Sequence, residues 1–190
     1  MTSGVVGDDE PVIDPAATET AVLALVPEAE PVVGEHRRRL DPTTAAGVPA
    51  HVTVLYPFVP PGEITTATVA ALRATVAPAA PFACTFSATG WFGEDLLWLA
   101  PSATASFSEL TALVWRAFPE QVPYDGEHEP HPHLTVGYRS HASLEELRAA
   151  EARIVPRLPV AAHVDRLHLL AGGRKADSWR VVAELPLRGA

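Results

Sequence analysis

The sequence has little cysteine, no long apolar run and few positive charges. Cys84 is the only cysteine among 190 residues, which excludes an intrachain disulfide. No apolar run approaches the roughly 18 residues that a membrane-spanning helix needs. The first residues contain neither the basic nor the apolar segment of a signal peptide. These absences predict a cytoplasmic protein that does not enter a membrane.

Positive charge is scarce: 14 Lys and Arg residues stand against 23 Asp and Glu residues, for a net charge of −9. This balance argues against a broad nucleic-acid surface and against duplex DNA as a partner. Residues 1–19 hold five of the acidic residues and no Lys or Arg, so the rest of the chain carries −9 + 5 = −4. We predict a disordered acidic tail over residues 1–18. The remainder can still offer the few donors that a small phosphate ligand needs.

Apolar periodicity in the remaining sequence predicts alternating strands and helices in the order β α β α β β α β α β β. Ser143 followed by Glu146 forms a capping box, which predicts where the last helix starts. Strands are predicted over residues 20–26, 51–58, 82–92, 96–100, 133–138, 160–170 and 179–187, helices over 31–40, 63–77, 102–118 and 143–154, and loops over 42–49 and 119–132.

The element order repeats within the chain. The series α β α β β that begins at residue 31 occurs again from residue 102, which indicates a duplicated unit. We therefore predict one bilobal domain over residues 19–190, with pseudo-twofold related lobes at 20–101 and 102–187.

A six-residue pattern accompanies this repeat. His51–Tyr56 and His133–Tyr138 both read H-x-T-V-x-Y, and each lies in the corresponding predicted strand of its half. A lone H-x-T occurs by chance. The shared valine, the shared tyrosine and the equivalent position argue against coincidence.

Strand geometry assigns the residues of this pattern to faces, because side chains alternate from one side of a strand to the other. His51 and Thr53 share one face of the first strand, and His133 and Thr135 share one face of the second. The valines and the tyrosine that ends each motif take the opposite, inward face. We therefore predict that the two His/Thr pairs line a groove and oppose each other across it.

Two histidines in a polar groove suit phosphodiester chemistry that needs no metal ion. One neutral imidazole can take a proton from an attacking hydroxyl or water, and one imidazolium can protonate the departing oxygen. The unperturbed pKa of histidine, near ~6.5, allows both forms at neutral pH. The hydroxyls of Thr53 and Thr135 can donate to nonbridging phosphate oxygens. The alternative is that His51 and His133 are hydrogen-bonded core residues, which the repetition of a polar His/Thr pair disfavours.

The two motifs resemble those of the 2H phosphoesterase superfamily, which includes bacterial 2′-5′ RNA ligases and cyclic phosphodiesterases. Its H-x-[T/S] hallmark with apolar flanks is present as H-V-T-V at 51–54 and as H-L-T-V at 133–136, and the likeness extends over roughly residues 20–187. The resemblance implies an α+β fold in which two antiparallel sheets flank a central groove and helices lie outside.

The resemblance also implies functional roles. His51 and His133 become the acid/base residues, and Thr53 and Thr135 become phosphate ligands, with no cofactor. The implied substrates are nucleotide or RNA-end phosphodiesters, such as 2′,3′-cyclic phosphates and 2′-5′ linked oligonucleotides. Hydrolysis of a 2′,3′-cyclic phosphate to a 2′-phosphate is the specific reaction that we expect.

Five residues outside the motifs are further candidates for substrate contact. RNA ligases of this superfamily often carry an arginine shortly after the second motif; here a tyrosine stands in that place and Arg139 follows, on the groove face if the strand has no bulge. Tyr124 and Trp91 are candidate stacking platforms for a nucleobase, or ordinary packing residues. Arg174 and Lys175, on a turn with two glycines, either contact phosphate or are solvated.

Two other functions remain open alternatives. A non-catalytic module with the same fold would only capture nucleotides or RNA ends. A metallohydrolase would instead bind a metal ion through His128, His131 and His133, because imidazole is a common ligand of transition metals.

Overall fold

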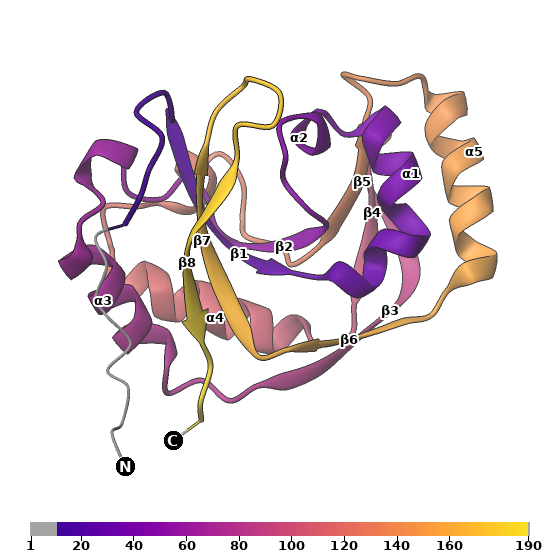
Figure 1. Cartoon of the computed structure of the whole chain (residues 1–190). Coiled ribbons are helices and arrows are strands. Elements are labelled where there is room, and N and C mark those ends of the chain that lie inside the picture. Colours follow the sequence, from indigo (N-terminus) through magenta and orange to yellow (C-terminus); the bar gives the residue numbers. More distant parts are fainter. Residues whose placement is uncertain (1–10, 190) are drawn as a thin grey trace, which may run out of the picture.

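The computed structural model describes residues 11–189. Figure 1 shows the arrangement of its helices and strands. Its helices are α1 (Glu30–Leu40), α2 (Pro42–Ala45), α3 (Thr66–Val76), α4 (Thr104–Ala117) and α5 (Leu144–Ile154). Its strands are β1 (Glu19–Leu25), β2 (His51–Leu55), β3 (Phe82–Phe92), β4 (Leu96–Pro101), β5 (Leu134–Tyr138), β6 (Val160–Val164), β7 (Arg166–Gly172) and β8 (Arg180–Pro186).

The strands form two antiparallel four-stranded sheets, with the orders β2-β1-β7-β8 and β5-β4-β3-β6. β2 and β5, which carry the two motifs, are edge strands of their sheets and lie beside each other where the sheets meet. The predicted α+β fold with two antiparallel sheets is confirmed.

The two sheets do not divide the chain at residue 101, where we placed the boundary between lobes. Strands from both ends of the chain form one sheet, and β3 to β6 form the other. The predicted strand over 160–170 is broken at Asp165 into β6 and β7, which belong to different sheets. An alternating sequence indicates a strand, but it does not show which neighbour the strand pairs with.

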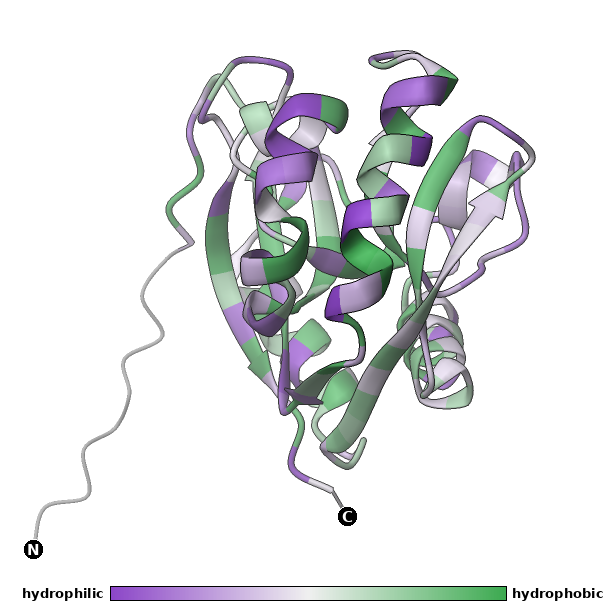
Figure 2. Ribbon diagram, turned by 90° about the vertical axis from the view of Figure 1, so that its right-hand side faces the viewer, coloured by the Kyte–Doolittle hydropathy of each residue, from purple (hydrophilic) through white to green (hydrophobic). Residues whose placement is uncertain are grey.

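Two helices cross from the sheet that precedes them to the opposite one. α1 follows β1 but packs against β5 and α5, while α4 follows β4 but packs against β2. α3 packs against α4 and β8. α1 and α5, nearest the viewer in Figure 2, alternate hydrophilic and hydrophobic residues, as expected for helices with one buried face. This exchange ties the two sheets together.

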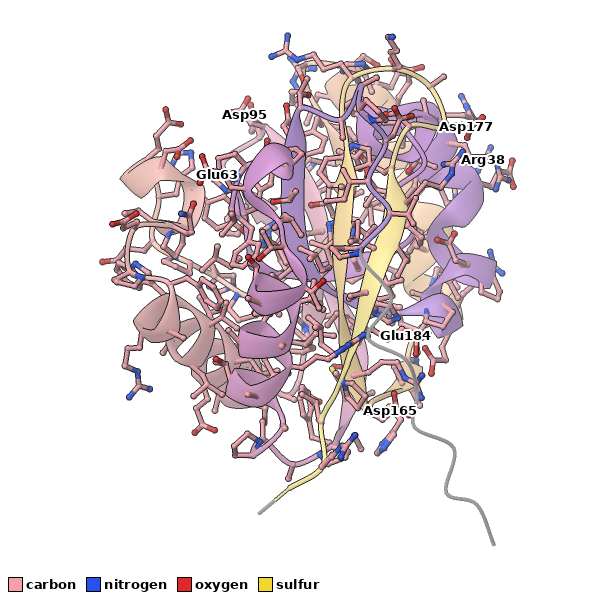
Figure 3. All side chains as sticks on the ribbon, turned by 60° about the vertical axis from the view of Figure 1, so that its left-hand side comes forward. Arg38, Glu63, Asp95, Asp165, Asp177 and Glu184 are labelled. Carbon is pink, nitrogen blue, oxygen red and sulfur yellow. The ribbon has the colours of Figure 1, made fainter. Side chains whose placement is uncertain are left out.

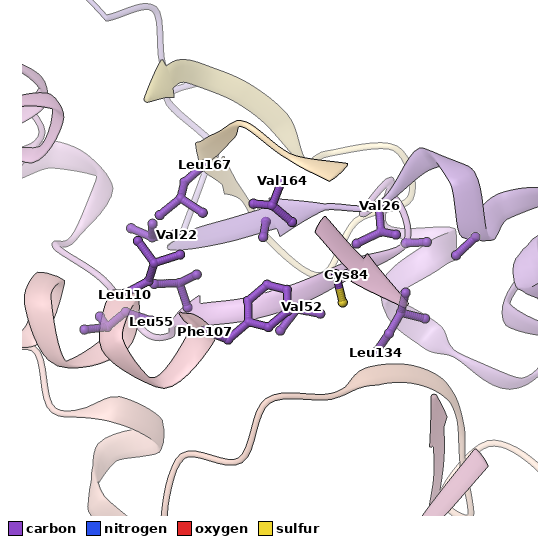
Figure 4. Packing of buried hydrophobic residues seen from close by; sticks show 14 of the residues in the cluster. Val22, Val26, Val52, Leu55, Cys84, Phe107, Leu110, Leu134, Val164 and Leu167 are labelled. Atoms are coloured by element: carbon purple, nitrogen blue, oxygen red, sulfur yellow. The ribbon is translucent and has the colours of Figure 1, made fainter. Parts of the chain in front are cut away.

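The main hydrophobic core fills the space between the sheets and helices (Figure 4). Val52 of β2 and Leu134 of β5, the variable residues of the two H-x-T motifs, are fully buried in it. Burying a Val or Leu side chain stabilises a fold by about 1.5–3 kcal/mol. These two residues therefore anchor the strands that present the histidines.

The charged side chains labelled in Figure 3 lie at the periphery. Residues 1–10 of the predicted acidic tail over 1–18 lie outside the described residues. Its last residue is hydrogen-bonded, since the Thr18 N–H donates to the Gly172 carbonyl at 2.8 Å.

The predicted capping box of α5 is confirmed: Ser143 Oγ accepts from the Glu146 N–H, and the Glu146 carboxylate accepts from the Ser143 N–H. No helix within residues 11–189 is long and apolar enough to span a bilayer.

Gly137 of β5 lets α1 approach the sheet closely, and this contact gives a first testable prediction. In Gly137→Ala the new Cβ would lie 2.6 Å from the Leu40 Cβ. Such overpacking should lower the free energy of unfolding by about 1–3 kcal/mol and the melting temperature by about 2–12 °C. Thermal unfolding followed by circular dichroism measures the change. Gly62→Ala is the control, because no atom lies within 4 Å of its new Cβ. Equal melting temperatures for both variants would contradict this account.

Candidate active site

Each motif strand contains a β-bulge at its valine. In the first, Thr53 pairs with Leu23 and Leu55 pairs with Val22, so Val54 is an extra residue. In the second, Thr135 pairs with Trp98 and Gly137 pairs with Leu97, so Val136 is the extra residue. A bulge bends a strand and redirects the side chains that follow it. The repeated pattern H-x-T-V-x-Y is thus the sequence of two equivalent bulged strands.

The bulges reverse the side-chain alternation after each threonine. Leu55 and Gly137 are buried, whereas Tyr56 and Tyr138 line the same cavity as the histidines. The prediction that both tyrosines face inward, made from unbroken alternation, is therefore wrong. The valine of each motif stays in the core.

The groove side of β2 and β5 forms a cavity of about 600 Å³, which we call the catalytic cavity. The structure brings five of the predicted site residues to its wall: His51, Thr53, Tyr124, His133 and Thr135. This volume lies within the range of roughly 300–1,000 Å³ that is usual for small-ligand sites.

The two imidazoles are held in the same way. His51 Nδ1 lies 2.8 Å from the carbonyl of Pro49, and His133 Nδ1 lies 2.6 Å from the carbonyl of His131, in each case two residues earlier in the chain. A carbonyl only accepts, so each Nδ1 carries the hydrogen. Nε2 of each neutral ring is therefore left with its lone pair, as a general base requires.

Burial lowers the pKa of both histidines. For His51, burial and the Arg37 guanidinium act together to lower the pKa to about 4, opposed in part by the Pro49 carbonyl and by Asp41. For His133, burial lowers the pKa and the hydrogen bond to the His131 carbonyl partly offsets it. Charged forms are disfavoured away from water, so both rings in the free protein favour the neutral base form, His51 the more strongly.

A buried ion pair supports the wall of the catalytic cavity beside His51. Arg37 Nη2 lies 2.9 Å from Asp41 Oδ2, and both side chains are about 1% exposed. Asp41 Oδ1 accepts from the Thr43 backbone N–H and hydroxyl, at 2.9 and 2.7 Å. These bonds cap α2, in a segment that we predicted to be a loop, and Thr43 lines the cavity. An Asp followed by Pro at the first helical position was an available signal for this helix.

Two aromatic rings pack against His133. The centroid of Phe92 lies 5.0 Å from that of His133, and the centroid of Trp98 lies 6.1 Å from it. His131 also packs edge-to-face against Phe92 and Trp98. Between residues 11 and 189 no three His, Cys, Asp or Glu side chains are placed to hold a metal ion. The structure therefore does not gather His128 with His131 and His133 into the metal site that the alternative interpretation required.

Two predicted substrate contacts lie away from the catalytic cavity. Trp91 Nε1 donates to Glu151 at 2.9 Å, and the Arg148 guanidinium stacks 4.2 Å from the centre of its ring. Arg139 is exposed beyond the end of β5, and its backbone N–H donates to the Asp95 carbonyl. We expected the Arg139 side chain to face the groove only if the strand had no bulge, and β5 has a bulge at Val136.

Three other residues that line the catalytic cavity supply charge and hydrogen bonds. Arg174 is the only Arg or Lys among the described residues at its wall. For Arg174, on a turn with two glycines, the sequence leaves open a phosphate contact or a solvated charge. The Tyr56 hydroxyl donates to Glu19 at 2.9 Å, and burial together with this carboxylate raises the pKa of Tyr56 to about 12. Because a tyrosine ends both motifs, the sequence contained a signal that Tyr56 belongs to the site.

Paired His and Thr residues from two equivalent edge strands define the class as the 2H phosphoesterases. The chain belongs to the 2′-5′ RNA ligase superfamily, whose family model matches residues 25–176. The predicted membership of the 2H phosphoesterase superfamily is confirmed.

Solved structures share the fold at low sequence identity. TT0787 of Thermus thermophilus is 19% identical with a TM-score of 0.64, and E. coli LigT complexed with 3′-AMP is 16% identical with a TM-score of 0.58. A structure described as a phosphoesterase is 16% identical with a TM-score of 0.55. Each alignment covers 90% of this chain and 98% of the other. No curated protein sequence matches the chain.

The lowered pKa of His51 predicts sensitivity to acid. The unfolded chain, with an ordinary histidine pKa of 6.5, binds more protons than the folded chain below that pH. The free energy of unfolding should therefore fall as the pH drops from 6.5 towards about 4. Urea titrations at pH 7 and pH 4.5 measure the loss, which should be smaller in His51→Gln. The exposed His141, replaced by Gln, provides the control. If His51→Gln lost as much stability as the wild type, His51 would not be the group responsible.

Proposed function

We propose that this protein is a metal-independent phosphodiesterase that acts on the 2′,3′-cyclic phosphate or the 2′-5′ phosphodiester of nucleotides and RNA ends. The observation that carries this proposal is the convergence of two imidazoles on one cavity, each with Nδ1 bonded to a backbone carbonyl and Nε2 left for acid/base work. General acid–base catalysis by positioned histidines contributes typically 10²–10⁴-fold to rate.

The proposed reaction is hydrolysis of a 2′,3′-cyclic phosphate. Nε2 of His51 takes a proton from water as the water oxygen bonds to phosphorus. The P–O3′ bond breaks, and protonated His133 delivers its Nε2 proton to O3′, leaving a 3′-hydroxyl and a 2′-phosphate. We assign His51 as the base because its pKa is lowered by Arg37 as well as by burial. His133 is the acid in this assignment.

The remaining polar groups of the catalytic cavity suit the charge of the phosphate. Thr53 and Thr135 carry hydroxyls that can donate to nonbridging oxygens, where negative charge grows in the transition state. Arg174 supplies a positive charge at the same wall. A nucleotide ligand also agrees with the fold relatives, since E. coli LigT structures are described as complexed with 3′-AMP, NADP+ and ATP. We expect this reaction to take place in the cytoplasm.

A non-catalytic binding module is the second candidate, and it would use the same cavity without turnover. Both His/Thr pairs are intact and both imidazoles are oriented as a general base requires, which favours an enzyme. Long incubation with substrate separates the two candidates, because a binding module would retain ligand without forming product.

The catalytic assignment is tested by assaying 2′,3′-cyclic nucleotides and 2′-5′ dinucleotides in EDTA. Wild-type protein should turn over at least one of them in the presence of the chelator. His51→Ala and His133→Ala should each lose at least ~10²-fold in kcat, because each removes one proton-transfer group. The matched control is His163→Ala, an exposed histidine of β6 that does not line the catalytic cavity. Full activity in either active-site variant would eliminate the mechanism, and loss of wild-type activity in EDTA would favour a metallohydrolase.

The pH dependence of kcat/KM should be bell-shaped with an acidic optimum. This parameter reports the pKa values of the free enzyme. The acid limb follows His51, whose pKa lies at about 4, and the alkaline limb follows His133, whose pKa is lowered from 6.5. The kcat profile should lie at higher pH, because a bound phosphate anion favours imidazolium. Steady-state rates between pH 3.5 and 9 measure both profiles, and a kcat/KM optimum above pH 7.5 would refute the assigned protonation states.

A further inference from the structure

The catalytic cavity extends well beyond the two histidines. Thr53 of β2 pairs with Leu23 of β1, and Glu19 lies four residues earlier on β1, at the wall of the same cavity. Each residue of a strand adds roughly 3.2–3.4 Å, so Glu19 lies about 13 Å along the sheet from the level of Thr53. This length leaves room for a ribose and its base between the proposed phosphate contact and Glu19.

The wall between these two levels of β1 is apolar. The apolar side chains that line the cavity are those of Ala21, Leu23, Ala46, Val48 and Trp179. They belong to one hydrophobic cluster, which is separate from the main core. The Trp179 ring is fixed in this cluster, because its Nε1 donates to the Gly173 carbonyl at 3.1 Å. An apolar wall of this kind suits a nucleobase, whose two faces are flat and uncharged.

The carboxylate of Glu19 is held at the far end of this wall by Tyr56. The Tyr56 hydroxyl donates to Glu19 Oε2 at 2.9 Å, and its raised pKa of about 12 means that it keeps this proton at neutral pH. Each carboxylate oxygen can accept more than one hydrogen bond. Within residues 11–189, Glu19 forms no ion pair. Tyr56 therefore orients a carboxylate that can still accept hydrogen bonds from a ligand.

Arg174 brings hydrogen-bond donors to the same end of the cavity. Glu19 pairs with Gly172 of β7, and Arg174 follows two residues later, at the cavity wall. Its positive charge reaches Tyr56, whose pKa it lowers in part. A guanidinium is a planar fork of donors that suits two neighbouring acceptors. This end of the cavity thus offers acceptors and donors together, while the charge of Arg174 still attracts the phosphate.

Guanine is the base that matches both groups. It presents two adjacent donors, N1–H and the N2 amino group, and two adjacent acceptors, O6 and N7, which arginine binds in a bidentate manner. Adenine and cytosine place a ring-nitrogen acceptor beside their amino group, and uracil places its single N–H between two carbonyls. A carboxylate opposite any of these three bases faces a lone pair next to the donor, which is unfavourable. Proteins read unpaired bases along these same edges.

We propose that Glu19, oriented by Tyr56, makes the catalytic cavity selective for guanine, so that the preferred substrate ends in a guanosine 2′,3′-cyclic phosphate. This inference rests on the proposed function. The base lies on the apolar wall, its N1–H and N2 amino group donate to the Glu19 carboxylate, and Arg174 donates to O6 or N7. Glu19 determines specificity and takes no part in proton transfer, so the changes at phosphorus are those proposed above.

The test compares kcat/KM for 2′,3′-cyclic GMP and 2′,3′-cyclic AMP in EDTA. The wild type should favour the guanine substrate by about 5- to 150-fold, the discrimination given by one bidentate base contact. Glu19→Gln should lower this ratio by a similar factor, because the amide places a donor opposite guanine and can pair with adenine instead. Tyr56→Phe should lower the ratio less, since it only releases the carboxylate. Glu63→Gln, at an exposed glutamate outside the cavity, is the matched control and should leave the ratio unchanged.

The outcomes separate this inference from the proposed function. No preference for guanine in the wild type, or an equal fall on both substrates in Glu19→Gln, would overturn guanine selectivity while leaving the phosphodiesterase intact. If neither substrate is hydrolysed, the proposed function fails, and the dissociation constants of guanosine 2′-phosphate and adenosine 2′-phosphate then test the base site by itself. The wild type should bind the guanosine compound about 5- to 150-fold more tightly, and equal constants would overturn the inference. Melting temperatures of all variants verify that they are folded.

Discussion

One extra residue in each motif strand determines which side chains face the catalytic cavity. Val54 and Val136 occupy equivalent bulges, and each bulge reverses the alternation that follows. The histidine, the threonine and the tyrosine of each motif consequently reach the same cavity, while the intervening apolar residues stay in the core. A regular strand would bury the tyrosine and turn its neighbour towards the cavity. Each bulge therefore places three functional side chains within six residues without disturbing the core.

The crossing of α1 makes the two sheets and the catalytic cavity interdependent. The helix follows β1 but packs on β5, where Gly137 permits the close approach of Leu40. The same helix carries Arg37, which pairs with Asp41, helps to hold the wall at Thr43 and lowers the pKa of His51. A buried ion pair adds little net stability because desolvation opposes the attraction, although losing one partner is costly. We therefore interpret this pair as a device for orientation and for the electrostatics of the base.

Much of this arrangement was predictable from the sequence, because it depends on local pattern. Most of the elements and the convergence of the two His/Thr pairs follow from periodicity and from a repeated motif, and the fold class follows from the family resemblance that the motif carries. Strand partners and bulges are set by tertiary pairing instead. For that reason the break at Asp165 was not predicted and the inward direction of the tyrosines was predicted wrongly, while the condition under which Arg139 was expected to face the groove, a strand without a bulge, is not met. For Trp91 the sequence left base stacking and ordinary packing open, because an aromatic residue in a strand does not reveal which layer covers it; here the ring pairs with Glu151 and Arg148 of α5.

The two halves of the site are alike in backbone but different in surroundings, and a directional reaction needs that difference. Both imidazoles use Nδ1 in the same way, so hydrogen bonding alone does not distinguish base from acid. Arg37 lowers the pKa of His51, whereas Phe92 and Trp98 pack against His133. In the proposed reaction, the residues outside the repeat would thus decide which imidazole acts as the base and which as the acid.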